Sequence, residues 1–509
     1  MLNRTYRRRS TALLGVVLVI ATAGLIYELS IAAIASYLLG DTVTQFSLVI
    51  GVYLSALGLG AYLSKFAASN LTLTFVRVEY ATALIGGFSV ILLELSFSYN
   101  APFRSLLLFT VIIVGVLVGL ELPILLRILE RQMSFRELVA RALGFDYLGA
   151  LFGSVGFSLW LVPNFGLVQT ALLCGILNAL VGIVSTWLLS ETPPHPPATY
   201  ARLRSVGLAI VLLLFAGLWF AEPMIRTGER QLYGDIVSAT QSPYQRIVLA
   251  KRGTQYEMFL NGHLQFSSND ERRYHEALVH PVLVSADSPR RVFVGGGGDG
   301  LALREILKWD TVESVILVDI DPAMTALAKS EPHLLELNEH SLRDKRVRVV
   351  NADAMHYLTS TRDSFDVILL DFPDPTQLGL GKLYSAQFFA TVRNRLAQDG
   401  ALGVQSTSPL LTRRSFWSIV GTLESVGLHV VPYRAFVPSF GDWGFVLARR
   451  VPFEFPNRLP KIPLFTLDDA GLVRLAELPH DVERVPAPIN RLNDQALVGV
   501  YLQESSRFE

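Results

Sequence analysis

The sequence predicts a multi-span α-helical membrane domain followed by an α/β Rossmann-like domain that begins with a small antiparallel β-sheet. Three observations predict this fold class. Residues 1–222 contain seven apolar stretches of about the length that crosses a bilayer. Residues 291–448 alternate apolar β-branched runs with helix-like segments. Residues 295–298 are four consecutive glycines that follow the first of those runs and precede a helix-like segment.

Composition supports a chain of two different halves. The chain has 509 residues, so we expect more than one domain. Its mean hydropathy of +0.40 is high for a soluble enzyme, and the apolar residues concentrate in the first half. The formal net charge is zero, which gives no reason to propose a nucleic acid partner. The single cysteine, Cys174, excludes a disulfide framework or a cysteine-based zinc site within one chain.

The first half is read as a bundle of membrane spans. The first apolar stretch is too long for a signal-peptide core and is followed by others, so we expect it to remain in the mature protein. The fifth stretch is the weakest, because Asp146 interrupts it. The stretches are 11–39, 43–67, 72–97, 105–129, 139–162, 164–189 and 205–222.

Basic residues in this half gather in particular links. They precede the first stretch, follow the second, surround the link after the fourth and precede the last. These positions share one side of the membrane if the amino terminus is inside, as the positive-inside rule expects. They are Arg4, Arg7, Arg8, Arg9, Lys65, Arg127, Arg131, Arg136, Arg141, Arg202 and Arg204.

Ionisable residues also lie within the apolar stretches. They are Glu28, Glu79, Glu94, Glu121 and Asp146. A charge at membrane depth is costly, and it suggests a functional site such as a transport pathway. Pairing between helices, for example with Arg77 or with tyrosines, explains the same residues equally well.

The second half opens with short alternating runs. Runs at 245–250 and 257–260 are separated by turn residues, and Asn261-Gly262 predicts a second tight hairpin. We therefore expect a small antiparallel sheet over 233–265. A helix over 270–283 should follow.

From residue 291 onward, strands and helices alternate, which predicts a mostly parallel sheet covered by helices on both faces. The predicted strands are 291–294, 314–318, 346–350, 365–370, 401–404, 428–431 and 443–448. The predicted helices are 300–308, 322–329, 354–359, 385–397 and 413–425. Ligands of such sheets bind beyond the carboxyl ends of the strands.

Five carboxylates fall at those strand ends: Asp299, Asp319, Asp353, Asp371 and Asp374. Glycines in the preceding turn let a ligand approach the backbone closely, and an acid about twenty residues later suits a ribose diol. Carboxylates gathered in one crevice repel one another, so the pocket predicts a positively charged ligand. Helix caps and turns are the alternative use of such aspartates.

These residues resemble the polyamine aminopropyltransferase (spermidine synthase) family, over about 233–448. These residues follow the predicted membrane half in the chain. This order makes the whole chain similar to the membrane-fused bacterial members of the family. The motifs are Ser242-Pro243-Tyr244-Gln245, Leu260-Asn261-Gly262-His263-Leu264-Gln265, Tyr274-His275-Glu276, Gly296-Gly297-Gly298-Asp299-Gly300, Val318-Asp319-Ile320-Asp321, Asp371 to Pro375, and Leu383-Tyr384. The resemblance implies a methyltransferase-like Rossmann domain.

The resemblance also implies roles for single residues. Asp371 matches the general base. Positions that match the binding site for the nucleoside of decarboxylated S-adenosylmethionine are Gln245, Gly296, Gly298, Asp319 (ribose), Asp353 (adenine amine) and Ala354. Positions that match the binding site for the aminopropyl group and the acceptor amine are Gln265, Tyr274, His275, Asp299 and Asp374.

The chain departs from the family pattern on the acceptor side. Leu370 stands where the family usually has serine, and Phe372 and Pro373 stand where it has small residues. Gln377-Leu378 replaces a Gly-Pro pair. Phe440 takes the place of a tyrosine near the last strand, and a phenyl ring cannot hydrogen-bond an amine.

The function implied is transfer of an aminopropyl group from decarboxylated S-adenosylmethionine to an amine, first of all putrescine, giving spermidine and methylthioadenosine. No metal or further cofactor is expected. One alternative is an S-adenosylmethionine-dependent methyltransferase, but Asp299 would repel the carboxylate of that donor. The other is a non-catalytic membrane polyamine sensor or transporter.

We expect domains at 1–222 (membrane), 223–290 (small sheet and helix), 291–450 (catalytic) and 451–509 (extension). Expected partners are small amine and nucleoside substrates and the lipid membrane; a homo-oligomer is left open. Seven spans from a cytoplasmic amino terminus would place the catalytic half outside the cell, away from a donor that is made inside. We therefore expect that 139–162 does not span the inner membrane and that the catalytic half is cytoplasmic.

Overall fold

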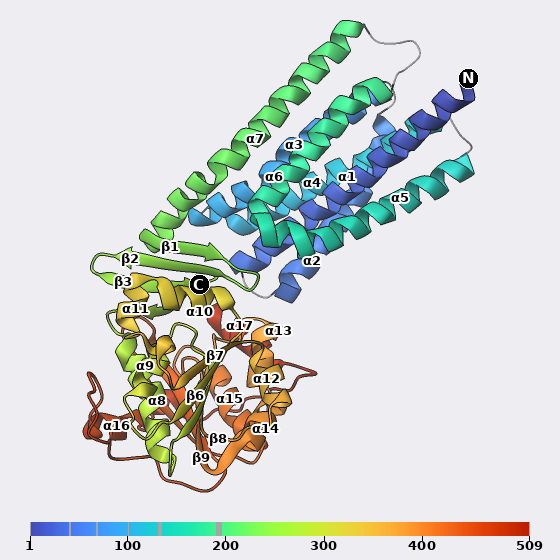
Figure 1. Cartoon of the computed structure of the whole chain (residues 1–509). Coiled ribbons are helices and arrows are strands. Elements are labelled where there is room, and N and C mark those ends of the chain that lie inside the picture. Colours follow the sequence, from blue (N-terminus) through green and yellow to red (C-terminus); the bar gives the residue numbers. More distant parts are fainter. Residues whose placement is uncertain are drawn as a thin grey trace. The chain divides into compact units, whose positions relative to one another are not determined.

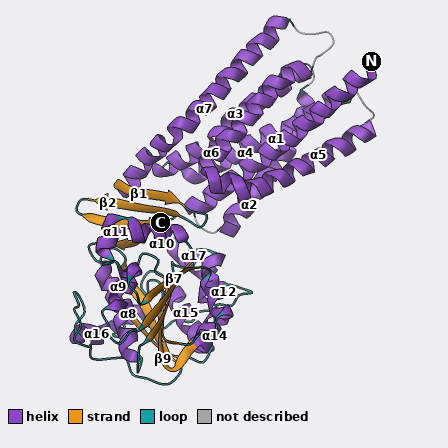
Figure 2. Ribbon diagram, in the orientation of Figure 1, coloured by secondary structure: helices purple, strands orange, loops and turns teal. Residues whose placement is uncertain are grey.

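The computed structural model describes residues 2–39, 42–67, 70–99, 101–130, 135–189 and 196–507 (Figure 1). Arg131 lies outside the described residues. The chain divides into two compact units, Met1–Gly234 and Asp235–Glu509. The first unit consists of helices, whereas the second contains both helices and strands (Figure 2).

The first unit is a bundle of long helices packed around two apolar clusters. Its helices are α1 (Leu2–Leu39), α2 (Thr42–Leu63), α3 (Leu71–Ser98), α4 (Phe103–Leu129), α5 (Phe135–Gly156), α6 (Val162–Leu188) and α7 (Pro197–Tyr233). Helix α2 lies close to α4, because a Cβ on Gly60 would come within 2.2 Å of the carbonyl oxygen of Val116. Helix α7 runs on to Tyr233, past residue 222, where we expected the membrane domain to end.

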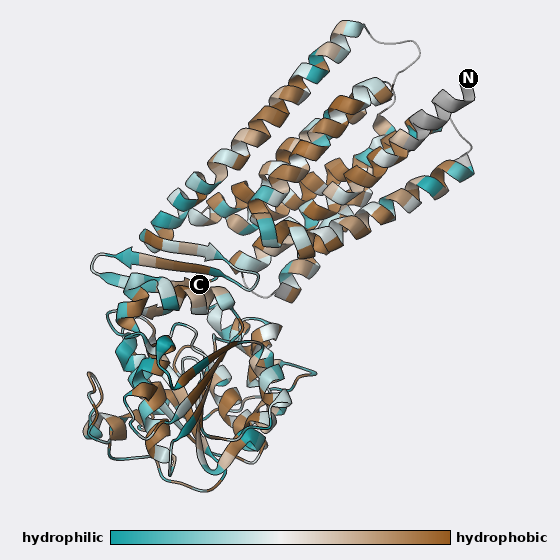
Figure 3. Ribbon diagram, viewed as in Figure 1, coloured by the Kyte–Doolittle hydropathy of each residue, from teal (hydrophilic) through white to brown (hydrophobic). Residues whose placement is uncertain are grey.

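Among the described residues, six apolar helical segments are long enough to cross a membrane (Figure 3). The predicted stretches 139–162 and 164–189 fall within a single segment, Arg136–Leu188, of 53 residues. They merge because a π-helical turn, Phe157–Leu161, joins α5 to α6. The backbone leaves helical geometry at Gly166 (φ 77°), and both α5 and α6 pack against α1. At about 1.5 Å per residue, this segment is more than twice as long as the hydrocarbon core is thick.

The second unit opens with the predicted antiparallel sheet, in the order β1-β2-β3-β4. Its strands are β1 (Asp235–Gln241), β2 (Arg246–Arg252), β3 (Gln255–Leu260) and β4 (His263–Ser267). Asn261 (φ 51°) and Gly262 (φ 81°) both adopt left-handed conformations, as a two-residue hairpin requires. Helix α8 (Glu271–Ser285) follows.

The main sheet has seven strands in the order β10-β11-β9-β8-β5-β6-β7. The five strands from β9 to β7 are parallel, while β10 and β11 are antiparallel, which confirms the mostly parallel sheet. The strands are β5 (Arg291–Gly296), β6 (Ser314–Asp319), β7 (Val347–Asn351), β8 (Phe365–Asp371), β9 (Leu396–Gln405), β10 (His429–Val437) and β11 (Gly441–Arg449).

Helices cover both faces of this sheet, and each face has its own apolar core. One core takes residues from α8, α9 (Leu301–Leu307) and α10 (Pro322–Ser330). The other takes residues from α12 (Ala354–Ser360), α14 (Ala386–Arg395) and α15 (Arg413–Ser425). Shorter helices are α11 (Pro332–Leu337) and α13 (Leu378–Gly381), and the extension adds α16 (Asp469–Leu475) and α17 (Ala496–Ser505).

Candidate active site

The glycine-rich turn after β5 lies directly against two of the predicted site carboxylates. Gly296 has a φ of 81°, and a Cβ there would come within 2.1 Å of the carbonyl oxygen of Asp371. A Cβ on Gly298 would come within 2.6 Å of Oδ2 of Asp319. Only glycine fits at these two positions, so the turn brings the ends of β6 and β8 together with its own backbone.

Asp319, at the end of β6, is held by backbone donors. The Gly298 N–H donates to its Oδ2 at 3.1 Å, and the Asp321 N–H donates to its Oδ1 at 2.8 Å. Burial raises the pKa of Asp319 to about 6. Each carboxylate oxygen has a second lone pair, so Asp319 keeps acceptor capacity for hydroxyl groups.

Gln245 is positioned by Asp321, a residue that the sequence analysis placed in a motif without a role. The Gln245 Nε2 donates to Oδ2 of Asp321 at 3.0 Å, and the Ser242 Oγ donates to the same oxygen at 2.7 Å. Asp321 is fully buried. The two motifs quoted for the resemblance, around Ser242 and around Asp319, therefore meet in space.

Asp353 caps helix α12, as the alternative explanation for such aspartates expects. Its Oδ1 accepts from the His356 N–H at 2.9 Å, and its Oδ2 forms an ion pair with Lys382, which the sequence analysis did not single out. Burial raises the pKa of Asp353, but the bonds from Lys382 and His356 outweigh burial and lower it. Ala354 is buried in the adjacent core.

Tyr274 and Asp371 meet, although 97 residues separate them in the chain. The Tyr274 hydroxyl donates to Oδ1 of Asp371 at 2.6 Å. Tyr274 comes from α8 and Asp371 ends β8, so helix packing on the sheet creates the contact. Burial raises the pKa of Asp371, and the charge of His275 and the bond from Tyr274 oppose that rise.

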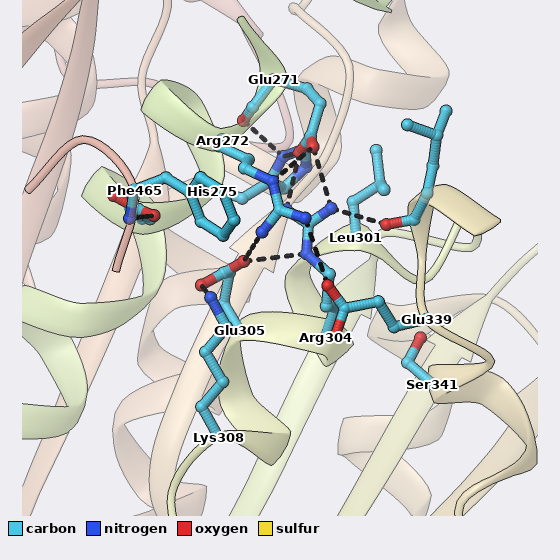
Figure 4. A network of polar contacts seen from close by, with 12 residues as sticks. Glu271, Arg272, His275, Leu301, Arg304, Glu305, Lys308, Glu339, Ser341 and Phe465 are labelled. Carbon is cyan, nitrogen blue, oxygen red and sulfur yellow. Dashed lines mark hydrogen bonds and ion pairs between the residues drawn. The ribbon is translucent and has the colours of Figure 1, made fainter. Parts of the chain in front are cut away.

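His275 is oriented from within the protein by an ion network (Figure 4). Its Nδ1 lies 2.8 Å from the Glu271 carbonyl oxygen and 2.9 Å from Oε2 of Glu271, so this nitrogen carries the hydrogen and donates. Arg304 binds the same carboxylate through two bonds of 2.8 Å. Burial lowers the pKa of His275, but the bond to Glu271 and the nearby charges of Asp299 and Asp371 raise it overall.

Asp299 lies in the turn between β5 and α9. Its Oδ1 accepts from the Leu301 N–H at 2.9 Å. Burial raises its pKa, while the positive charge of His275 opposes the rise. A cationic group placed beside Asp299 would favour the ionised carboxylate in the same way.

Asp374 is held by two side chains that the sequence analysis missed. Gln405, at the end of β9, donates from Nε2 to Oδ1 at 3.1 Å, and the Tyr501 hydroxyl on α17 donates to Oδ2 at 2.7 Å. Burial raises the pKa of Asp374 to about 6, and both bonds lower it. No local motif could reveal these partners, because Tyr501 follows Asp374 by 127 residues.

The bulky residue Phe372, in the loop after β8, packs into an apolar core. Phe372 is buried, and its ring packs 6.0 Å from the ring of Phe388 in the core. The Tyr384 hydroxyl donates to the carbonyl oxygens of Phe372 and Pro373 at 3.1 and 3.2 Å, which fixes the loop. Phe440 packs 6.2 Å from Tyr274, between ring centroids.

Gln265 behaves differently from the other predicted residues. Its Nε2 donates to the carbonyl oxygen of His263 at 3.1 Å, within β4. Hydrogen bonds join Tyr274 to Asp371 and Gly298 to Asp319. The bond of Gln265, by contrast, stays within its own strand. Its predicted role stays a prediction.

Comparison with known proteins identifies the family. The model of the spermine/spermidine synthase domain matches residues 271–451. A polyamine aminopropyltransferase of Leptospira interrogans is 46% identical over 98% of this chain and 99% of its own length, and polyamine aminopropyltransferase 2 of Ralstonia nicotianae is 43% identical over 98% of each. A solved spermidine synthase in complex with the transition-state analogue AdoDATO is 26% identical, with a TM-score of 0.46, over 49% of this chain and 87% of that one.

These relatives confirm the resemblance that the motif residues predicted, and they decide for aminopropyl transfer over methyl transfer and over a purely binding role. In this family decarboxylated S-adenosylmethionine is the co-substrate, and no metal cofactor takes part. With 46% identity to a curated member across nearly its whole length, the chain belongs to the polyamine aminopropyltransferase family and is an enzyme of that kind.

Proposed function

We propose that the second unit transfers the aminopropyl group of decarboxylated S-adenosylmethionine to putrescine, giving spermidine and methylthioadenosine. The observation that carries this proposal is the contact of the buried Tyr274 with the half-buried Asp371, at 2.6 Å, beside the glycine-rich turn. A carboxylate whose pKa is raised by burial is a stronger base than one in water. Asp371 would accept the proton that a protonated amine must lose before it reacts.

The proposed step is a displacement at carbon. The amine nitrogen attacks the methylene next to the sulfonium, and a C–N bond forms as the C–S bond breaks. The electrons of the C–S bond remain on sulfur, so neutral methylthioadenosine leaves. The amine proton passes to Asp371. Such proton transfer typically contributes about 10²- to 10⁴-fold, and positioning of the two reactants supplies much of the remainder.

The donor is proposed to lie along the glycine-rich turn. Asp319 would bind the ribose hydroxyls, Asp353 the adenine amine, and Gln245 a further polar group of the nucleoside. Gly296 and Gly298 support close approach of the donor, because no side chain could fit there. Asp299 would bind the ammonium of the aminopropyl group, and its charge disfavours a donor that keeps its carboxylate.

The acceptor is proposed to lie between Tyr274, His275 and Asp374. Asp374 would bind the ammonium farther from the reacting nitrogen, because its charge is stabilised by two hydrogen bonds within the described residues. Gln265 would contribute from β4. A diamine with one free and one anchored nitrogen fits this arrangement, and putrescine is such a diamine.

The test is an assay of the purified full-length protein with labelled decarboxylated donor and a panel of amines that includes putrescine, cadaverine and spermidine. We expect labelled spermidine from putrescine at the highest kcat/KM. Ordinary S-adenosylmethionine is the matched control and should transfer nothing. Faster transfer to another amine would overturn the choice of putrescine, and methyl transfer from the control donor would overturn the donor assignment.

We further propose that the catalytic unit is cytoplasmic, that the protein lies in the inner membrane, and that domain boundaries fall near 290 and 450. A cytoplasmic site supports access to a donor made inside cells. With a cytoplasmic amino terminus, a cytoplasmic catalytic unit requires an even number of membrane crossings. If the other five apolar segments each cross once, the segment Arg136–Leu188 must also cross once. Reporter fusions after Glu229 and after Glu509 test this: phosphatase activity, which needs export, would contradict a cytoplasmic catalytic unit.

A further inference from the structure

The last helix of the chain contributes a side chain to the acceptor side of the site. Tyr501, on α17, donates its hydroxyl to Oδ2 of Asp374 at 2.7 Å. The family domain matches only residues 271–451, so this contact comes from outside it. This partner of Asp374 therefore belongs to the C-terminal extension, beyond the residues that the family domain matches.

Helix α17 is fixed in place rather than loosely attached. Glu504, which is buried, accepts from the backbone N–H groups of Arg414 and Ser415 at 2.9 and 3.0 Å, at the start of α15. Asn490 is fully buried and donates from Nδ2 to the carbonyl oxygen of Gly381 at 2.9 Å. These bonds hold the extension on both sides of Tyr501. Packing of the extension therefore fixes the position of Tyr501 beside Asp374.

We propose that Tyr501 is a positioning residue for the amine acceptor, which it serves by orienting the Asp374 carboxylate. This inference rests on the proposed function. Phe440 stands where the family usually has a tyrosine, and its ring offers no hydrogen bond. Tyr501 supplies a phenol to the acceptor side from a different segment of the chain, while Gln405 binds the other oxygen of Asp374 at 3.1 Å.

The hydrogen bond also bears on the charge of Asp374. Burial raises the pKa of Asp374 to about 6, and the bond from Tyr501 acts against that rise. Without the phenol the pKa rises further, and a smaller fraction of Asp374 is ionised at a given pH. An ammonium group then binds less well, and the loss is largest on the acid side.

The test is Tyr501→Phe in the full-length protein, which keeps the ring and removes only the hydroxyl. We expect the KM for putrescine to rise about tenfold, as for loss of one hydrogen bond to a charged group. The kcat and the KM for the donor should stay within about twofold, and the acid limb of kcat/KM for the acceptor should move to higher pH. Gln503→Ala, an exposed position on the same helix, is the control and should change none of these.

An unchanged acceptor KM in Tyr501→Phe, with an active wild type, would overturn this inference alone. Equal losses in kcat, donor KM and acceptor KM would also overturn it, because they indicate a general structural role. If the wild type itself transfers no aminopropyl group to any amine, the proposed function fails instead, and the two failures are thereby distinguished.

A second, independent observation concerns the core of the membrane unit. Glu79 of α3 is fully buried and Glu121 of α4 is 1% exposed, and the two carboxyl groups interact electrostatically. The Thr82 hydroxyl donates to Oε1 of Glu121 at 2.9 Å. Neither carboxylate oxygen of Glu79 has a hydrogen-bond partner among the described residues. Arg77, a partner considered from the sequence, is exposed.

Two further polar groups are buried beside this pair. Asn178 of α6 is fully buried, and both its side-chain amide atoms lack partners among the described residues. It lies one turn before Gly182, whose Cβ position is 3.3 Å from the Cβ of Glu79, so it shares the face turned toward α3. The Tyr27 hydroxyl of α1 is also buried and, within the described part of the chain, without a partner.

We propose that Glu79 and Glu121 share one small monovalent cation, H⁺ or Na⁺, in the interior of the membrane unit. Unpaired carboxylates within a membrane are costly, whereas a cation between them removes that cost. The Asn178 and Tyr27 oxygens add hard ligands of the kind that suit such ions. Tyr27 of α1 interacts electrostatically with both carboxyl groups, and Tyr53 of α2 interacts with Glu121. Cys174 of α6 interacts with Tyr27, Glu28 of α1 interacts with Tyr53, and from α7 Arg204 is bonded to Thr186.

The test uses the full-length protein in lipid nanodiscs and dicyclohexylcarbodiimide, which modifies protonated carboxyl groups in apolar surroundings. Peptide mass spectrometry locates the modification, and NaCl is compared with choline chloride at equal ionic strength. A proton site predicts labelling of Glu79 or Glu121 that falls as pH rises and is equal in both salts. A sodium site predicts protection by NaCl alone, lost in Asn178→Leu. Labelling no greater than that of the exposed Glu222, at every pH and in both salts, would overturn the proposal.

Discussion

The carboxylate proposed to bind the donor and the two proposed to act on the acceptor are held in different ways. Asp319 accepts from the backbone of Gly298 and Asp321, which are 21 and 2 residues away in the chain. Asp371 and Asp374 instead accept from the phenols of Tyr274 and Tyr501, which are 97 and 127 residues away. Backbone donors position the first carboxylate, whereas side chains from distant elements position the other two.

This difference has a consequence for function. A backbone N–H survives every substitution except proline, so the two hydrogen bonds that hold Asp319 need no side-chain donor. A phenol is lost by a single substitution, so the hydrogen bonds to Asp371 and Asp374 depend on the side chains of Tyr274 and Tyr501.

The largest effect that this comparison predicts is for Asp371→Asn. An amide cannot take the proton of the amine, so we expect turnover to fall by about 10² to 10⁴. Methylthioadenosine should bind as before, because the donor side is intact. Steady-state kinetics and calorimetry measure the two quantities. Turnover above a few per cent of the wild type would show that Asp371 is not the base.

The next effect is for Asp319→Ala, on the donor side. Loss of hydrogen bonds to a charged group costs roughly 1.5–3 kcal/mol. We therefore expect methylthioadenosine to bind about ten- to over a hundredfold more weakly by calorimetry. Asp374→Asn, on the acceptor side, is the control and should keep its affinity. Unchanged affinity in Asp319→Ala would remove the ribose assignment.

The same difference explains what the sequence could predict. The mostly parallel sheet and the hairpin at Asn261-Gly262 depend on local patterns, and the structure has both. Gln405 and Tyr501 lie in segments without a recognisable motif, so only the folded chain reveals their contacts with Asp374.

The sequence did not determine the direction in which the side chain of Phe372 points. Phe372 departs from the family pattern, and a bulky residue beside Asp371 suggested a changed acceptor site. Its ring enters the core instead, because successive residues at the end of β8 point to opposite faces. The direction of a side chain at a strand end depends on the sheet around it, which a motif alone does not specify.

A smaller effect is expected for Tyr274→Phe. The Tyr274 hydroxyl lowers the pKa of Asp371, so its removal raises that pKa further above the ordinary value. A base with a higher pKa is ionised only at higher pH, so the acid limb of the kcat profile should move to higher pH, by about one unit. An unmoved limb, measured beside the wild type, would show that Asp371 does not depend on this phenol.

The smallest effect is expected for Lys382→Met, which removes the ion pair with Asp353. Because both side chains are about a third exposed, at 33% and 28%, the pair should stabilise the protein by at most roughly 1 kcal/mol. Lys382 and His356 hold the pKa of Asp353 below its ordinary value. Their stabilisation is therefore present above the ordinary pKa and is lost as pH falls through the lowered one.

Lys382→Met should accordingly lower the melting temperature of the full-length protein at neutral pH and have less effect in acid. Lys461→Met, at an exposed position, is the matched control. The His356 N–H still holds Asp353 at the start of α12, so methylthioadenosine affinity should change by less than about threefold. A loss as large as that of Asp319→Ala would show that Lys382 itself binds the nucleoside.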